Sequence, residues 1–193
     1  MLRIVVIVLV LVLAITIIHA LARQGLFRSI GDLFLMTAIG ALGAKIADVD
    51  QVIPFLNHRS AVTHSIFLPM VLAMVPGVRA AAGPLFLGMS CHLVADFFPS
   101  RMTGFALIQV PGWGSIGVVL SYVWLGINAL IACAMGHALL KDETSGFVRF
   151  LVTVALGIGA YYYLLVLEGS RWAFGAFITV YGLTYLTSLR EEA

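Results

Sequence analysis

Residues 80–99, AAAGPLFLGMSCHLVADFFP, constrain the fold more than any other stretch of the chain. Apart from His92 and Asp96, the side chains before Pro99 are small or apolar, and proline cannot continue a helix. Because about 20 mostly apolar residues suffice to cross a bilayer, we predict that this stretch forms a transmembrane helix. Its last turns carry one imidazole and one carboxylate.

The whole chain has the composition of an integral membrane protein. Its 193 residues are 62% hydrophobic and 10% charged, with a mean hydropathy of +1.08. This composition argues against a soluble globular domain, and the 11 basic residues are scattered singly, which argues against nucleic acid as a partner. We predict an all-α fold, a polytopic membrane helical bundle of about six to seven transmembrane or partly inserted helices. It is expected to form a single integral membrane domain over residues 1–193.

The predicted helices follow the apolar runs, over residues 1–22, 29–47, 64–75, 80–98, 117–140, 147–167 and 172–189. The first run also resembles a cleaved signal peptide, but we expect it to be a transmembrane helix. Residues 100–114 lack a clean periodicity and are expected to form a loop over or beside the site. The metal-site core is expected within about residues 30–115, because the helices over 116–189 carry no motif.

A cluster of ionisable residues interrupts this apolar sequence between positions 48 and 96. Its members are Asp48, Asp50, His58, Arg59, His64, His92 and Asp96. Counting helices along the chain places the end of the second, the start of the third and the end of the fourth at one membrane face. A carboxylate at membrane depth costs on the order of 3 kcal/mol, so a bound cation among these residues is favoured.

The spacing within this cluster is typical of metal ligands. His92 and Asp96 are four residues apart and therefore share one face of a helix. Asp48 and Asp50 lie where a helix runs into a loop, so both carboxylates can turn towards one centre. The predicted ligands of a divalent metal are Asp48, Asp50, His64, His92 and Asp96. The histidines favour zinc, as one or two ions.

Three other interpretations stay open. In the first, the carboxylates belong to an interfacial ion-pair network, in which Asp48, Asp50 and Asp96 pair with Arg59, Lys45 and Arg101. In the second, the chain is a membrane metal or proton transporter, although the helices after residue 115 contain no mid-span carboxylate. In the third, it is a non-catalytic membrane scaffold that a metal stabilises.

The motifs resemble those of the YdjM family of LexA-regulated inner-membrane proteins, which are classed as metal-dependent hydrolases. The resemblance covers roughly residues 30–115. It rests on four segments: Asp48-Val49-Asp50, His58-Arg59, Thr63-His64-Ser65 and His92-Leu93-Val94-Ala95-Asp96. It implies hydrolase activity in a bacterial inner membrane and leaves the substrate open.

We therefore expect a membrane-embedded hydrolase that acts on a phosphoester or other ester of a lipid or lipid-linked substrate at the bilayer surface. His58 is the expected general acid or base, and Arg59 is expected to bind an anionic oxygen with both arms of its guanidinium group. Thr63 and Ser65 are expected to hydrogen-bond the metal ligands. Arg101 is a candidate substrate contact.

Overall fold

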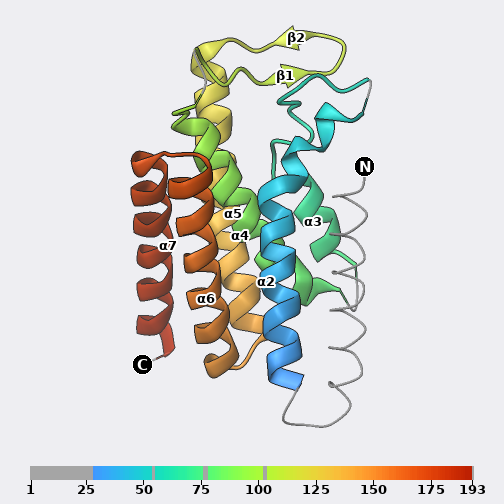
Figure 1. Cartoon of the computed structure of the whole chain (residues 1–193). Helices are drawn as coiled ribbons and strands as arrows, with labels where there is room; N and C mark the ends of the chain where they lie inside the picture. Colours follow the sequence, from blue (N-terminus) through green and yellow to red (C-terminus); the bar gives the residue numbers. More distant parts are fainter. Residues whose placement is uncertain (1–27, 54, 76–77, 102–103, 193) are drawn as a thin grey trace, which may run out of the picture.

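The computed structural model describes residues 28–53, 55–75, 78–101 and 104–192 (Figure 1). The transmembrane helix expected over residues 1–22 lies outside these ranges.

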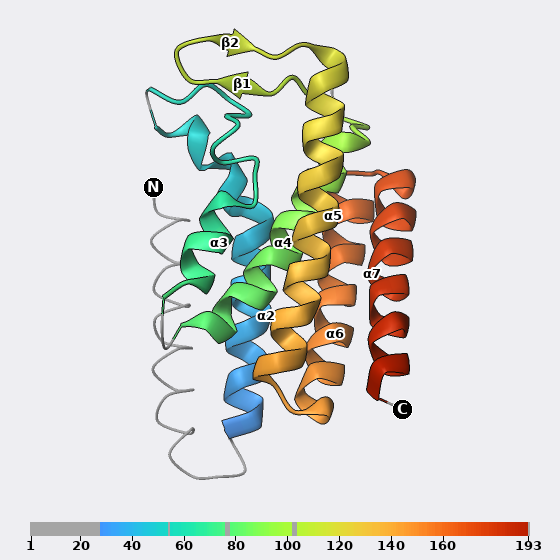
Figure 2. The same cartoon turned by 180° about the vertical axis from the view of Figure 1, so that it is seen from behind.

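Five long helices of the described chain lie side by side in a bundle (Figures 1 and 2). They are α2 (Arg28–Ile46), α4 (Arg79–Phe97), α5 (Val118–Glu143), α6 (Gly146–Tyr161) and α7 (Arg171–Glu192). α2 continues into a 3₁₀ turn, η1 (Ala47–Gln51), and α6 continues into a π-helix, η2 (Tyr162–Leu167). The short α3 (Phe67–Ala73) packs against α4 and begins three residues later than the helix expected from His64.

Helix α4 lies at the centre of the bundle, in contact with α2, α3, α5, α6 and α7. Every residue from Ala82 to Leu93 is buried. A helix that is covered on all sides needs no polar face, and this explains why the sequence of α4 is apolar around its whole circumference. The two polar side chains near its end, His92 and Asp96, are thereby held inside the protein.

Among the residues that the structure describes, four helical segments are long and apolar enough to cross a membrane: Ile30–Gln51, Arg79–Phe97, Val118–Glu143 and Val148–Leu167. The prediction of a helical membrane bundle agrees with this finding, but the expected number of six to seven spans is not confirmed. The seven residues of α3 reach only about 10 Å, which is a third of a bilayer core. α7 is long enough but contains several threonines and charged residues at its C-terminal end, and it is not among the four.

Glycines set the close approach of α2 and α4. A side chain at Gly88 would collide with the carbonyl group of Gly40, and one at Gly43 would collide with the carbonyl group of Leu85. Small residues at a helix contact let two backbones pack directly against each other. This contact places the backbone of α2 beside His92, whose Nδ1 lies 3.0 Å from the carbonyl oxygen of Ala44.

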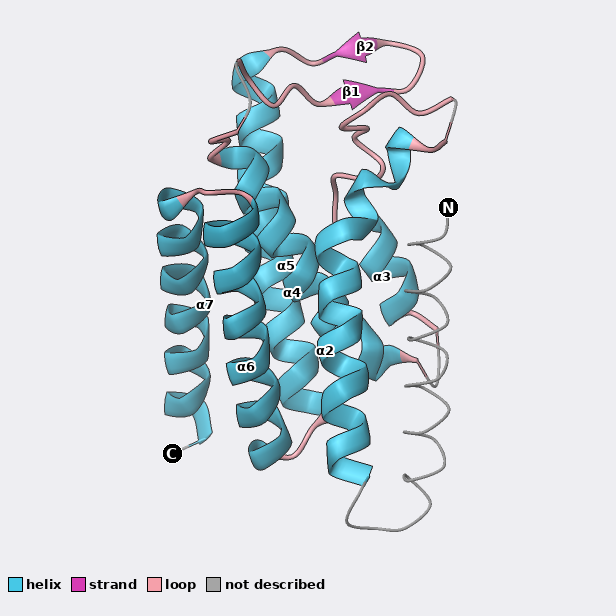
Figure 3. Ribbon diagram, viewed as in Figure 1, coloured by secondary structure: helices cyan, strands magenta, loops and turns pink. Residues whose placement is uncertain are grey.

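Residues 104–117 form a strap at one end of the bundle, with a small hairpin of β1 (Gln109–Val110) and β2 (Gly114–Ser115) (Figure 3). β1 also forms a parallel bridge with Ser60. The amide of Gln109 donates to the carbonyl of Arg59 at 2.9 Å, and the amide of Ala61 donates to the carbonyl of Gln109 at 2.8 Å. The segment therefore bonds the loop that precedes α3. A loop over or beside the site was predicted, but the hairpin was not.

Candidate metal centre

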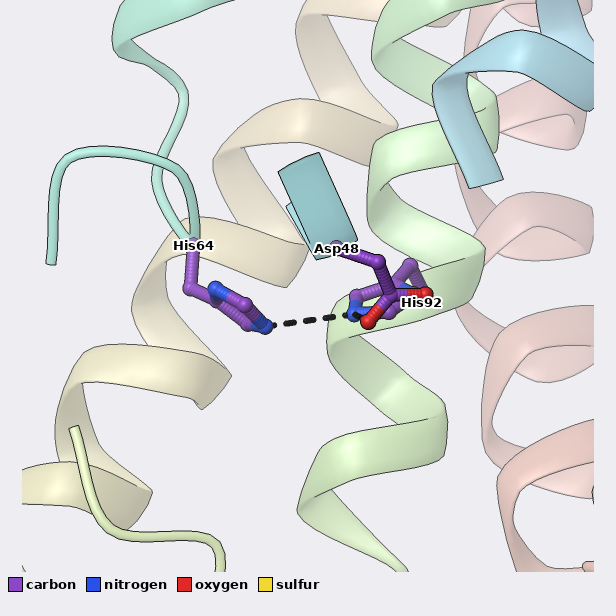
Figure 4. Close-up of side chains that lie close together, drawn as sticks. All are labelled: Asp48, His64 and His92. Carbon is purple, nitrogen blue, oxygen red and sulfur yellow. Dashed lines mark hydrogen bonds and ion pairs between the residues drawn. The ribbon is translucent and has the colours of Figure 1, made fainter. Parts of the chain in front are cut away.

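Three ligand side chains from separate segments meet near this end of the bundle. Asp48 comes from η1, His64 from the loop before α3, and His92 from α4 (Figure 4). One ligand atom from each lies within 4.8 Å of the ligand atoms of the other two. The group can therefore hold a metal ion, and three of the five predicted ligands belong to it.

The two imidazoles face each other through their Nε2 atoms, which are 3.3 Å apart. Two nitrogens that are each about 2.0–2.1 Å from a tetrahedral zinc ion are roughly 3.3–3.4 Å apart, so this separation fits a shared ion. The nearest carboxylate oxygen is Oδ2 of Asp96, which lies 3.2 Å from Nε2 of His64 and 3.8 Å from Nε2 of His92. Oδ1 of Asp48 is 4.0 Å from Nε2 of His92. Asp96, the fourth predicted ligand, thus borders the group.

The outer nitrogen of His92 is held by hydrogen-bond acceptors. Its Nδ1 lies 3.0 Å from the Ala44 carbonyl oxygen and 2.9 Å from the Tyr163 hydroxyl. Because a carbonyl oxygen only accepts, this contact assigns the proton of the neutral imidazole to Nδ1. Nε2 of His92 then carries a lone pair directed at His64.

The outer nitrogen of His64 has a similar environment. Its Nδ1 lies 3.3 Å from Oδ2 of Asp50 and 3.1 Å from Oγ1 of Thr63, which itself donates to Asp50 at 2.8 Å. Because Thr63 donates its one hydroxyl hydrogen to Asp50, its oxygen accepts from Nδ1 of His64, and Nε2 of a neutral His64 then carries a lone pair. Metal-binding histidines are commonly fixed in this way, with the second ring nitrogen donating to a carboxylate or a carbonyl group.

With both protons on Nδ1, the two Nε2 lone pairs and the carboxylate of Asp96 face and repel one another, and a metal ion would take the place of a proton shared by His64 Nε2 and Asp96 Oδ2, which are 3.2 Å apart. The rings are almost completely buried, with His64 0% and His92 4% exposed, so water screens this repulsion poorly. A cation between the two Nε2 atoms removes it. The electron-rich centre is the chemical feature that most favours metal binding here.

The structure places Asp50, also predicted as a ligand, behind His64 rather than beside the two Nε2 atoms. Oδ2 of Asp50 accepts from the Ser60 amide at 2.9 Å and from Thr63. A 3₁₀ helix has three residues per turn, so residues two apart point in different directions. Asp48 and Asp50 therefore diverge in η1, and Asp50 orients His64 from outside.

Arg59 forms a two-pronged ion pair with Asp96. Nε is 3.2 Å from Oδ2, and Nη2 is 3.3 Å from Oδ1. The backbone of Arg59 has a φ of 60°, an uncommon value for a residue with a side chain, and its carbonyl is held by Gln109. This pair is one element of the ion-pair network considered from the sequence. A second is the contact of Lys45 Nζ with Oδ2 of Asp48, at 3.9 Å.

The remaining predicted site residues have different positions. His58 is half-exposed, and its Nδ1 lies 3.5 Å from Oδ1 of Asp50. Thr63 contacts His64, as expected, whereas the Ser65 hydroxyl donates to the Val62 carbonyl and accepts from the Phe67 amide at the start of α3. Arg101 is placed away from the cluster, where Nη2 donates to the Val166 carbonyl at 3.0 Å.

Two α5 side chains that support the loop before α3 were not assigned to the site from the sequence. Nε1 of Trp124 donates to the His64 carbonyl at 2.8 Å, and Oδ1 of Asn128 accepts from the Ile66 amide at 3.1 Å. Their spacing of four residues puts both on one face of α5, which was the available signal. Tyr163 was also not assigned to the site from the sequence, because no motif residue lies near it in the chain.

The fold and the site together define a class: a helical bundle with candidate membrane spans, whose buried His and Asp side chains can hold a metal ion. Comparison of the chain with protein-family models, with curated proteins and with solved structures gives no match.

Proposed function

We propose that the chain is an integral membrane hydrolase that uses one or two divalent metal ions, and that the metal is zinc. The observation that carries the proposal is the 3.3 Å separation of the His64 and His92 Nε2 atoms, each with its proton assigned to the other ring nitrogen. The metal ligands are then His64, His92, Asp48 and Asp96, with Asp50 as the carboxylate that orients His64.

Zinc suits this set because it accepts imidazole nitrogens and carboxylate oxygens at short distances. A bound zinc ion would polarise the scissile group and lower the pKa of a coordinated water molecule towards about 7. Hydrolytic zinc sites have three protein ligands and leave the fourth position open for water or substrate, so one zinc ion is bound by His64, His92 and one of the two carboxylates, Asp48 or Asp96. Asp48 is the most exposed member of the group, with 30% of its side chain accessible, so substrate is expected to approach from its side.

Two cationic side chains lie beside the candidate carboxylate ligands, and one histidine lies beside Asp50. Arg59 and Lys45 contact the two candidate carboxylate ligands, and both are positioned to attract an anionic group towards the metal. His58 is half-exposed and hydrogen-bonded to Asp50, so it can exchange a proton with solvent as a general acid or base. A phosphoester fits these charges best.

The location of the centre suggests a lipid or lipid-linked substrate. Asp48 lies near the end of the candidate span Ile30–Gln51, and His92 lies near the end of the candidate span Arg79–Phe97. A site near the ends of two spans is accessible to molecules in the bilayer surface. We also propose membership of the YdjM family and a place in a bacterial inner membrane, which rest on the motif resemblance and on the convergence of three of its segments.

Elemental analysis of the purified chain tests the proposal. Wild type is expected to contain stoichiometric zinc, and the His64→Ala and His92→Ala variants are expected to lose it. His58→Ala is the matched control, because its imidazole is outside the ligand group and its metal content should stay at the wild-type level. Retention of zinc by both ligand variants would contradict the proposal.

Hydrolysis is measured separately, on a diacyl phosphoester presented in mixed micelles. Wild type is expected to cleave it, and removal of metal by chelation should abolish cleavage. Bound zinc without cleavage of any phosphoester or carboxylic ester would instead favour a metal-stabilised scaffold.

A further inference from the structure

A second feature of the bundle is an apolar groove of about 290 Å³ that runs between α2 and α6. α4, η2 and α7 close its floor and sides. The α2 wall contains Gly40, Ala41 and Ala44, and the α6 wall contains Leu156, Gly159 and Ala160. The groove exists because small residues face one another where larger side chains would have filled the space. Ala41 and Gly159 are exposed, so the groove opens towards the surface of the bundle that a bilayer would cover.

The dimensions of the groove match one hydrocarbon chain. On α2 it extends from Thr37 to Lys45, a rise of eight residues or about 12 Å at 1.5 Å per residue. On α6 and η2 it extends from Ala155 to Leu167, or about 18 Å. One leaflet of a bilayer core is about 15 Å deep, which is half of the roughly 30 Å total. Its volume is at the lower end of the range for ligand pockets, which begins near 300 Å³.

The polar end of the groove adjoins the metal centre. Lys45 lies at this end, with Nζ 3.9 Å from Oδ2 of Asp48 and 4.9 Å from the centre of the Tyr163 ring. Tyr163 also lines the groove, and its hydroxyl is 2.9 Å from Nδ1 of His92. A single cation at the mouth of an apolar groove complements an amphiphile with an anionic head. Tyr163 belongs to the π-helix η2, so this segment contacts both the groove and His92 of α4.

We propose that the groove between α2 and α6 binds one acyl chain of an anionic phospholipid, with the phosphate at Lys45 beside Asp48. That this lipid is a substrate rests on the proposed hydrolase function, since its phosphoester would then lie at the metal centre. The binding itself requires only the groove and Lys45. The substrate class is a diacyl or monoacyl lipid with a phosphate close to its glycerol or similar backbone.

Two glycines of α6 provide a matched pair of variants. A side chain added to Gly159 enters the groove, and one added to Gly157 points elsewhere on the same helix. The first side-chain carbon has no neighbour within 4 Å at either position, so both substitutions fit without a clash at that atom. Gly159→Phe is expected to fill the groove, while Gly157→Phe adds the same ring outside it.

The probe is phosphatidic acid with a diazirine near the end of one acyl chain, added to the full chain in detergent. After illumination, labelled peptides of wild type should come from the α2 and α6 walls. Gly159→Phe should reduce labelling of these peptides about tenfold or more, because excluding even two methylenes from an apolar site costs about that factor. Gly157→Phe should label like wild type. Equal labelling of both variants would overturn the proposal, as would labelling spread evenly over all helices.

Competition identifies the head group that binds. Unlabelled phosphatidic acid should displace the probe, whereas inorganic phosphate should not, since it lacks the chain. Phosphatidylcholine at the same concentration should compete at least a few-fold less well. Lys45→Gln should weaken the preference for phosphatidic acid over neutral diacylglycerol by about fivefold, the upper range for an exposed ion pair. Equal competition by inorganic phosphate would overturn the acyl-chain assignment.

Zinc content measured on the same samples separates the two proposals. Groove labelling that depends on Gly159 in a protein without zinc supports the lipid site and contradicts the metal-dependent function. Zinc-loaded protein with equal labelling of the two glycine variants contradicts the lipid site alone.

Discussion

Thr63 and Ser65 flank His64 in the sequence, but their hydroxyl groups have different partners. The Thr63 hydroxyl lies between Asp50 and Nδ1 of His64, whereas the Ser65 hydroxyl bonds the backbone at the start of α3. Thr63→Val keeps the shape and removes the hydroxyl. It should weaken zinc binding roughly tenfold, because such supporting hydrogen bonds typically contribute 10- to 100-fold to metal affinity. Competition with a zinc-binding dye measures this change.

Ser65→Ala serves as the control for this prediction. Loss of the helix-capping hydroxyl should lower the free energy of unfolding by about 1 kcal/mol and leave the zinc affinity unchanged. Thr63→Ser keeps the hydroxyl group and should therefore bind zinc with the affinity of wild type. An equal loss of zinc affinity in Ser65→Ala and Thr63→Val would show that the hydroxyl of Thr63 has no specific role.

Arg59 and a metal ion both stabilise the negative charge of Asp96. The carboxylate is 13% exposed and receives two hydrogen bonds from the guanidinium group. In Arg59→Gln the metal-free protein should lose about 1–3 kcal/mol of stability, the usual cost of removing a charged hydrogen-bond partner. Zinc should offset that loss, so the increase in melting temperature on adding zinc should exceed that of wild type. A smaller increase would mean that Arg59 supports zinc binding rather than competing for Asp96.

At the scale of helices and loops, the apolar runs predicted the elements and the motifs predicted their convergence. α2, α4, α5 and the α6–η2 segment begin and end within a few residues of the expected positions. His64 and His92 meet because the chain runs back along α3 and returns along α4, which ends at the same side of the bundle as α2, as the count of helices implied. The direction of each side chain at the end of α2 was not predictable, because whether the chain continues as a 3₁₀ turn depends on the tertiary contacts of Asp50.

The side chains of α5 and η2 that support the site were also not predicted from the motifs. Tyr163 contacts His92, Trp124 donates to the His64 carbonyl, and Asn128 accepts from the Ile66 amide, each over 60 or more residues of sequence. The four-residue spacing of Trp124 and Asn128 puts both on one face of α5, but it does not indicate which distant loop that face contacts. Gly40 was likewise given no role from the sequence, yet a side chain at Gly88 would collide with its carbonyl group, so the two glycines set the approach of α2 to α4.

That glycine contact gives a prediction at the level of helix packing. The methyl group in Gly88→Ala would meet backbone atoms of α2, so the two helices must separate, at a cost of about 1–3 kcal/mol. Asp48 and His92 move apart with them, and zinc affinity should fall as well. Thermal unfolding in detergent and zinc titration measure the two effects. Gly157→Ala, which adds a methyl group in open space, should be neutral or stabilising by up to about 1 kcal/mol. A Gly88→Ala protein with wild-type zinc affinity would contradict the dependence of the site on this contact.

For the whole molecule, a metal at this position connects parts of the chain that are otherwise joined by loops. Asp48 follows α2, His64 precedes α3, and His92 belongs to α4, while the strap over residues 104–117 holds the loop from the other side. A ligand that binds the folded protein alone stabilises it by about 2.7 kcal/mol at 100 times its dissociation constant. Removal of zinc by EDTA should therefore lower the melting temperature by roughly 5–10 °C in a chain of this size.

The controls for this measurement are the His64→Ala/His92→Ala double variant and EDTA preloaded with zinc. The double variant lacks both imidazoles, so EDTA should not change its melting temperature, and zinc-loaded EDTA should leave wild type unchanged. If EDTA lowers the melting temperature of the double variant by as much as that of wild type, the stabilising metal is bound elsewhere. If EDTA acts on wild type alone, the stability of the bundle and the occupancy of the histidine centre are one linked equilibrium, since ligands from three segments can meet around the ion only in the folded chain.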